Sequence, residues 1–319
     1  MLKVLKWLAI GLGVVVILLV GAFLALRQGP VPYATLEQRY AVPASRYMDL
    51  PGDMRVHYRD EGKPDGPVLV LIHGYSDSTA TWKGWIKALS PDYRIISLDL
   101  PGHGLTRAPA TYVSGSEPYA DLVATVTKKL NAPKFAVAGN SMGGGVAWTL
   151  ALRHPERVSA LILVDAAGWP ETGSNQKTAL AFKLLRYAWG RWLLSQMDLR
   201  PVIAEGVTKA FYDPSKADAG MINRFADEAR APGHAQILMG QGGRRFPATP
   251  ERMAQIHQPT LVMHGENDNI IPVAHGKQFG ATIPGAKLIL YPKVGHSPQM
   301  EIPEQSAADA RAFLKANGV

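Results

Sequence analysis

The sequence predicts an α/β domain built on a mostly parallel sheet, with helices on both faces, a helical insertion and an N-terminal membrane helix. Short apolar runs recur along the chain, and helix-like stretches such as 119–130 and 143–154 lie between them. Strands buried on both faces of a parallel sheet have this uninterrupted apolar character, and their alternation with helices is typical of an α/β fold. The expected strands lie at 68–74, 94–99, 134–138, 160–165, 259–264 and 286–291, after a leading hairpin of 48–50 and 55–58.

The N-terminal segment is uniformly apolar. Residues 7–26 contain no charged side chain, and at about 1.5 Å per residue a helix of this length spans roughly 30 Å, the thickness of the hydrocarbon core of a bilayer. A cleaved signal peptide has a shorter apolar region, of about 7–15 residues, that ends in a small-x-small site. Ala22 and Ala25 are not spaced for that site. We therefore expect an uncleaved membrane anchor at 1–27 in preference to a removed signal peptide or a buried core helix.

The charges that flank this anchor predict its orientation. Lys3 and Lys6 precede the span, and Arg27 alone lies close behind it. Because positively charged flanks stay in the cytoplasm, we expect a cytoplasmic N-terminus and an extracytoplasmic domain, which in a bacterium lies on the periplasmic face of the inner membrane. Residues 28–47 then form a juxtamembrane linker, within which 35–40 is expected to be a short helix.

Small residues recur in the span at multiples of four. This spacing places them on one face of a helix, where they allow a second helix to approach closely. The span therefore predicts a homodimer contact through a face composed of Ala9, Gly13, Gly21 and Ala25. The plainer interpretation is that glycine and alanine are common in membrane spans.

A sharp turn around Ser141 is the strongest functional signal. Ser141 lies between Gly139 and Gly143, directly after the strand expected at 134–138. A serine at the tip of a strand-to-helix turn has a strained backbone, and side chains two residues to either side would collide, so both of these positions need glycine. The following helix directs its N-terminal N–H groups towards an oxyanion beside the serine. The pattern indicates a nucleophilic serine, and the alternative is a glycine-rich loop that packs a helix on a sheet.

Two further side chains complete a catalytic set with Ser141. Asp268 and His296 each follow one of the last two expected strands. Because the carboxyl ends of parallel strands meet at one edge of an open sheet, where ligands bind, we expect these side chains to converge. Asp165, which ends the strand expected at 160–165, is the alternative acid.

Five short motifs in this order resemble the α/β-hydrolase superfamily: His73-Gly74, 99–104, 139–143, 265–268 and Gly295-His296. The resemblance extends from about residue 48 to the C-terminus. It implies the α/β-hydrolase fold, with a core at 48–168 and 258–319 and a helical cap at 169–257. The order nucleophile, acid, base is the one found in that fold, and the Gly-x-x-Asp context favours Asp268 over Asp165.

Each group then has an expected role. His296 takes the proton of Ser141 as general base, and Asp268 orients His296 and stabilises its protonated form. The backbone N–H groups of Met142 and Tyr75 are expected to form the oxyanion hole.

Asp99 and His103 are expected to brace the loop after their strand.

The remaining composition argues against several kinds of ligand. The chain has no cysteine and no pair of histidines with the spacing of a zinc helix, so no metal site is indicated, and no cofactor is implied. Its basic residues are dispersed, which argues against nucleic acid as a partner.

The expected cap carries a notable stretch at 178–197. Large apolar and aromatic side chains with a basic fringe suit a helix at a lipid interface or along an acyl-chain tunnel, and an ordinary cap helix packed on the core is the alternative. The net charge of +8 and the pair Arg244-Arg245 add attraction to anionic head groups.

Together these features predict a membrane-anchored serine hydrolase that cleaves carboxylic esters of medium or long acyl chains through an acyl-enzyme. The expected partners are a lipid membrane and an acyl ester or phospholipid substrate. The layout is similar to that of membrane-anchored bacterial esterases and phospholipases A. Two alternatives are a carbon–carbon bond hydrolase of ring-fission products, which the sequence around Ser141 also resembles, and a non-catalytic lipid-binding protein on the same fold.

Overall fold

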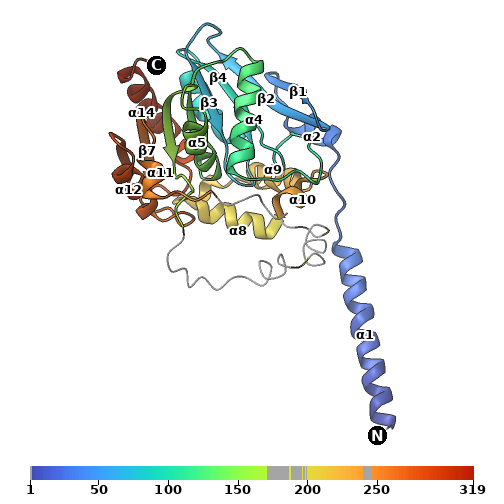
Figure 1. Ribbon diagram of the computed structural model, residues 1–319. Coiled ribbons are helices and arrows are strands. Elements are labelled where there is room, and N and C mark those ends of the chain that lie inside the picture. Colours follow the sequence, from blue (N-terminus) through green and yellow to red (C-terminus); the bar gives the residue numbers. More distant parts are fainter. Residues whose placement is uncertain (1, 171–186, 188–195, 197, 199, 240–245) are drawn as a thin grey trace.

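The computed structural model describes residues 2–170, 187, 196, 198, 200–239 and 246–319. Its sheet has eight strands in the order β1-β2-β4-β3-β5-β6-β7-β8 (Figure 1). β1 and β2 form an antiparallel hairpin, β2 pairs antiparallel with β4, and the pairs from β4 through β8 are parallel. The predicted mostly parallel sheet is therefore confirmed. The strands are β1 Ser45–Leu50, β2 Met54–Gly62, β3 Val68–Ile72, β4 Arg94–Leu98, β5 Phe135–Asn140, β6 Val158–Val164, β7 Thr260–Gly265 and β8 Lys287–Tyr291.

Helices cover both faces of the sheet, and each buried strand contributes side chains to two apolar cores, one on each face. In β3, Val70 and Ile72 point into one core, whereas Leu69 and Leu71 point into the other. Burying one such side chain stabilises a protein by about 1.5–3 kcal/mol, whereas a typical hydrogen bond contributes about 0.5–1.5 kcal/mol. Apolar burial therefore contributes more per residue to holding the sheet together than its hydrogen bonds do. The first core includes residues of α4 Ser116–Lys129, α5 Met142–Arg153 and α12 Val273–Thr282, and the second includes residues of α3 Lys83–Leu89 and α14 Pro303–Ala316.

The insertion between β6 and β7 is helical where the structure describes it. Figure 1 shows α8 on the side of the domain from which the N-terminal helix extends. The stretch at 178–197, apart from two isolated positions, and the pair Arg244-Arg245 lie outside the described residues. The helices of the insertion are α8 Arg200–Ala210, η2 Pro214–Lys216, α9 Ala219–Ala229, α10 His234–Met239 and α11 Pro250–Met253, and the remaining short helices of the domain are η1 Thr79–Trp82 and α13 Pro298–Glu301.

The N-terminal helix α1, Leu2–Leu26, projects away from the domain (Figure 1). Its segment Val4–Ala25 has a mean hydropathy of 2.9, and it is long and apolar enough to cross a membrane, either as an anchor or as a signal sequence. Its large side chains face outward; Trp7, for example, is 72% exposed. A helix that is apolar all round satisfies its own backbone and needs an apolar surrounding, which a bilayer supplies.

The linker after α1 contains the expected short helix and is packed on the domain. This helix, α2 Tyr33–Tyr40, begins after Pro32, whose fixed φ suits a helix start. Val31 and Leu36 are buried in a small apolar cluster with Leu105 and Ala231. The linker is therefore part of the folded unit.

Polar contacts attach this linker to the insertion. Asp227 of α9 accepts hydrogen bonds from Arg39 Nη1 and from the Tyr40 hydroxyl, both at 2.7 Å. Closer to α1, Gln28 Nε2 donates to Asp198 Oδ2 at 2.8 Å. An exposed ion pair contributes little alone, but Asp227 is largely buried and has two donors, which makes this contact directional.

Candidate active site

Ser141 occupies a strained turn between β5 and α5. Its φ of 55° and ψ of −119° lie where residues other than glycine are rarely found. A Cβ atom on Gly139 would lie 2.1 Å from the carbonyl oxygen of Gly143, and one on Gly143 would lie 2.3 Å from that of Ile72. Both glycines are therefore required by the backbone path, for the steric reason expected from the sequence.

The Asp268 and His296 side chains lie together at the carboxyl edge of the sheet. Asp268 Oδ2 is 2.7 Å from His296 Nδ1. Asp268 Oδ1 accepts hydrogen bonds from the N–H groups of Ile270 at 2.7 Å and Ile271 at 2.9 Å. Burial by itself raises the pKa of Asp268, but the neighbouring His264 and His296 rings outweigh it and hold this pKa well below its usual range. The pair therefore has the geometry in which a carboxylate orients an imidazole.

The backbone of His296 is attached to two other parts of the site. Its carbonyl oxygen accepts a hydrogen bond from Asn140 Nδ2 at 3.1 Å, and its N–H donates to the carbonyl of Ala210 at 2.6 Å. Asn140 is the residue before Ser141, and Ala210 ends α8 of the insertion. Sequence reasoning missed both residues. Asn140 could have been noticed only as a buried polar side chain within an apolar strand.

The loop after β3 lies against the Ser141 turn. A Cβ atom on Gly74 would be 3.4 Å from Ser141 Cβ, so the backbone approaches the serine closely there. The N–H groups of Tyr75 and Met142 have no hydrogen-bond acceptor among the described residues. Two unpaired donors flanking a serine match the arrangement of an oxyanion hole.

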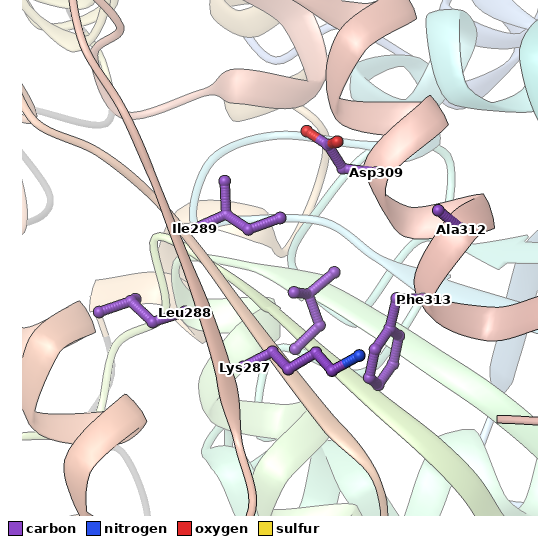
Figure 2. A pocket seen from close by; sticks show the side chains of 7 residues that line it. Lys287, Leu288, Ile289, Asp309, Ala312 and Phe313 are labelled. Carbon is purple, nitrogen blue, oxygen red and sulfur yellow. The ribbon is translucent and has the colours of Figure 1, made fainter. Parts of the chain in front are cut away.

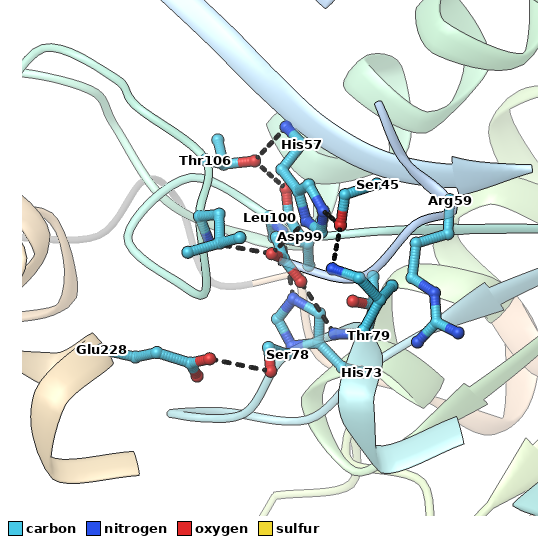
Figure 3. A network of polar contacts seen from close by, with 12 residues as sticks. Ser45, His57, Arg59, His73, Ser78, Thr79, Asp99, Leu100, Thr106 and Glu228 are labelled. Carbon is cyan, nitrogen blue, oxygen red and sulfur yellow. Dashed lines mark hydrogen bonds and ion pairs between the residues drawn. The ribbon is translucent and has the colours of Figure 1, made fainter. Parts of the chain in front are cut away.

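Asp99 braces the loops behind this site, as the sequence suggested. Its carboxylate is buried and contacts His57 Nδ1 at 2.7 Å (Figure 3). It also accepts hydrogen bonds from the N–H groups of Thr79 at 2.7 Å and Leu105 at 2.8 Å. Burial alone would raise the pKa of Asp99, but the adjacent His57 ring lowers it well below its usual range. The second nitrogen of His57 contacts Ser45 Oγ at 2.8 Å, and that hydroxyl also accepts the N–H of Val42. This second serine, histidine and aspartate set is therefore saturated by structural contacts.

His103 lies near the same loops but has no chemical role that we can assign. It is buried, its ring packs against His73 at 4.9 Å between centroids, and burial lowers its pKa well below the usual range. A neutral, packed ring fits the expected bracing role.

Asp165, the alternative acid, lies beside Asp268 and not in the position of the histidine's partner. It follows β6 with a φ of 44°, its side chain is fully buried, and its Oδ1 accepts the N–H of Gly265 at 2.9 Å. His264 Nε2 is 3.5 Å from Asp165 Oδ1 and 3.5 Å from Asp268 Oδ2. Among the described residues these three side chains form a grouping whose ligand atoms lie within 4.8 Å of one another. Because the Asp268 oxygens already accept three N–H groups, we interpret the grouping as a hydrogen-bonded cluster.

A pocket at the far edge of the sheet is separate from this site. Figure 2 shows it between β8 and α14, and none of the candidate site residues lines it. We assign it no part in the chemistry. Its lining residues are Leu261, Lys287, Leu288, Ile289, Asp309, Ala312 and Phe313.

Curated proteins similar to this chain include hydrolases of two kinds. The chain is 28% identical over 260 residues to a pimeloyl-[acyl-carrier protein] methyl ester esterase of Nitrosomonas europaea, covering 78% of this chain and 96% of that protein. It is 26% identical over 258 residues to a 2-hydroxy-6-oxononadienedioate/2-hydroxy-6-oxononatrienedioate hydrolase of Comamonas testosteroni, covering 78% and 87%. The first cleaves an ester by its name, and the second is a dienedioate hydrolase.

Solved structures place the fold in the same group. A bacterial membrane phospholipase A superposes with a TM-score of 0.71 at 24% identity, covering 99% of both chains. A meta-cleavage product hydrolase of Pseudomonas fluorescens superposes with a TM-score of 0.72 at 23% identity, covering 85% of this chain and 97% of the other. At these identities the likeness concerns the fold. The family model described as alpha/beta hydrolase fold matches residues 67–303, and the chain therefore belongs to the α/β-hydrolase family.

Proposed function

We propose that this protein is a membrane-anchored serine hydrolase that cleaves carboxylic esters with medium or long acyl chains. The observation that carries the proposal is the 2.7 Å contact between His296 and the buried Asp268, on a loop that Asn140 ties to the strained turn of Ser141. These are the parts that a serine nucleophile needs: a base, a group that orients the base, and a turn that presents the hydroxyl.

The proposed reaction proceeds through an acyl-enzyme. With Nδ1 of His296 engaged by Asp268, Nε2 is the nitrogen left to take the proton of Ser141. Ser141 Oγ attacks the ester carbonyl carbon, and the N–H groups of Tyr75 and Met142 stabilise the oxyanion. The tetrahedral intermediate collapses as His296 returns the proton to the leaving alcohol. A water molecule, deprotonated by His296, then attacks the acyl-enzyme, which releases the carboxylic acid and restores Ser141.

The membrane helix supports the choice of lipid esters as substrates. An enzyme tethered by α1 meets acyl esters of the bilayer at high local concentration. The contact between Gln28 and Asp198 holds the insertion near the end of that helix, and Ala210 of α8 bonds the backbone of His296. In this proposal α1 is an uncleaved anchor, its N-terminus is cytoplasmic, and the catalytic domain is extracytoplasmic.

A carbon–carbon bond hydrolase is the second candidate, because dienedioate and meta-cleavage product hydrolases are among the similar proteins. A test compares purified full-length protein on p-nitrophenyl esters from acetate to palmitate, on lysophospholipid and on a ring-fission dienoate. We expect ester turnover that increases with acyl length in the presence of lipid vesicles. Cleavage of the dienoate alone would contradict the ester proposal. Failure on every substrate, with binding of fatty acid, would favour the non-catalytic lipid-binding role.

The small-residue face of α1 gives a separate prediction about assembly. We propose that α1 dimerises through Gly13 and Gly21, and we expect Gly13→Leu with Gly21→Leu to reduce crosslinking of the protein in membranes. Among the described residues, and apart from the nearby backbone of α1 itself, no atom lies within 4 Å of a Cβ added at either position, so leucine fits the monomer. Gly11→Leu is the matched control, because it adds the same side chain to α1 about 160° around the helix from Gly13 and about 80° from Gly21. Equal crosslinking of the double variant and the control would rule out this face.

A further inference from the structure

Only one of the two oxygens of the buried Asp165 carboxyl group accepts a hydrogen bond from the described residues. Its Oδ1 accepts the N–H of Gly265, whereas its Oδ2 is buried and has no partner among the described residues. A buried, unpaired carboxylate oxygen costs free energy, because its hydration is lost without replacement. If the group holds a proton, it gains an O–H donor and needs only an acceptor nearby.

Asp268 provides that acceptor. Both carboxyl groups lie 3.5 Å from the same nitrogen of His264. That nitrogen also lies 3.0 Å from the carbonyl oxygen of Ile271, to which its single N–H can donate. This one N–H is therefore shared among the Ile271 carbonyl oxygen and the two carboxyl groups, and it cannot fully pair with both carboxyl groups. One oxygen of each carboxyl group lies within 4.8 Å of the other. Two buried carboxylates this close do not both remain ionised, and one of them keeps a proton.

The donors around each group decide which one keeps the proton. Asp268 faces His296 Nδ1 and the N–H groups of Ile270 and Ile271, all within 2.9 Å. Asp165 faces one backbone N–H group. Hydrogen bonds to a carboxylate favour its charged form, so the negative charge belongs on Asp268 and the proton on Asp165.

We propose that Asp165 is a neutral acid that donates a hydrogen bond to Asp268 and so keeps the carboxylate of the triad in place beneath His296. Asp165 is then a positioning residue that acts through Asp268. The proposal rests on the proposed function for its kinetic consequences, but the protonation of Asp165 is independent of that function.

The ionisation of both groups agrees with this assignment. Burial raises the pKa of Asp165 well above its usual range, and the negative charge of Asp268 raises it further. The pKa of Asp268 is held well below its usual range despite its burial. The titratable groups that act on this pair come from several elements, and they are His264 of β7, Tyr291 of β8, His296, and Glu301 of α13.

Two substitutions of Asp165 separate positioning from catalysis. Asp165→Ala removes the donor, and we expect kcat for ester hydrolysis to fall about 10–100-fold with little change in KM, as for other groups that orient a functional residue. Asp165→Asn keeps the shape, and its amide can accept from Gly265 while donating to Asp268, so we expect it to recover most of that loss. Asparagine also tolerates the positive φ of this position. If Asp165→Asn instead loses as much activity as Asp268→Asn, the proposal is wrong.

Thermal unfolding against pH gives a readout that does not need activity. A group whose pKa is raised in the folded state stabilises the fold fully below its unfolded pKa, which is about 3.9, and loses that contribution as the pH rises towards the folded pKa. Asparagine does not titrate. As the pH rises from about 4 to 8, the melting temperature of Asp165→Asn minus that of the wild type should therefore become more positive. A difference that is constant over this range would overturn the proposal, whether or not the protein proves to be an esterase.

Discussion

Replacement of Ser141 by alanine is expected to lower kcat for ester hydrolysis by about 10⁶-fold, because removing the nucleophile removes the whole acyl-enzyme route. KM should change little, since the substitution removes a single oxygen atom. The measurement is steady-state hydrolysis of a p-nitrophenyl ester by the purified full-length protein. The positive φ of this residue belongs to the turn and not to the hydroxyl, so alanine does not relieve the backbone strain.

A matched serine controls for preparation and folding. Ser90 follows α3, and its hydroxyl donates to the carbonyl of Ile86 on the opposite side of the sheet from α5. Ser90→Ala should keep wild-type activity. If Ser141→Ala still hydrolyses the ester after further purification has removed contaminating esterases, the nucleophile is elsewhere.

Asp268→Asn should lower kcat by about 10⁴-fold, because an amide cannot hold His296 in the tautomer that accepts the proton of Ser141. The same variant should be less stable than the wild type at neutral pH. Since the folded pKa of Asp268 is depressed, its contribution is present above the unfolded pKa of about 3.9 and is lost as the pH falls through the folded value. The difference in melting temperature should therefore shrink in acid.

The assignment of Asp268 as the acid of the triad can be contradicted by comparing the two asparagine variants. If Asp268→Asn keeps more than about a tenth of the activity while Asp165→Asn loses nearly all of it, Asp165 is the acid of the triad. The structure favours the first assignment because His296 Nδ1 contacts Asp268.

Much of the sheet could be predicted from the sequence because its central strands are buried on both faces. The run at 68–74 lies within two residues of the observed Val68–Ile72, since every side chain of that strand enters an apolar core. The leading hairpin was predicted too short. Its second strand extends to Gly62 because residues 58–62 pair with β4, and backbone pairing does not require apolar side chains.

The candidate site was predictable where a local motif carries a steric or topological meaning. The Ser141 turn and the loops of Asp268 and His296 are of this kind, because strand ends converge on one edge of the sheet. Asn140, Ala210 and the closeness of Asp165 to Asp268 were not predictable. They depend on contacts between segments far apart in the chain, and no periodicity or spacing marks such contacts.

The packed linker has a practical consequence for preparing a water-soluble enzyme. The apolar span ends before Arg27, so a truncation there removes the apolar helix. A cut at the first strand, in contrast, would also remove Val31 and Leu36 and uncover Leu105 and Ala231, which these residues bury. It would leave Asp227 without Arg39 and Tyr40. We therefore expect the smallest stable fragment to start between Arg27 and Val31, well upstream of the sheet.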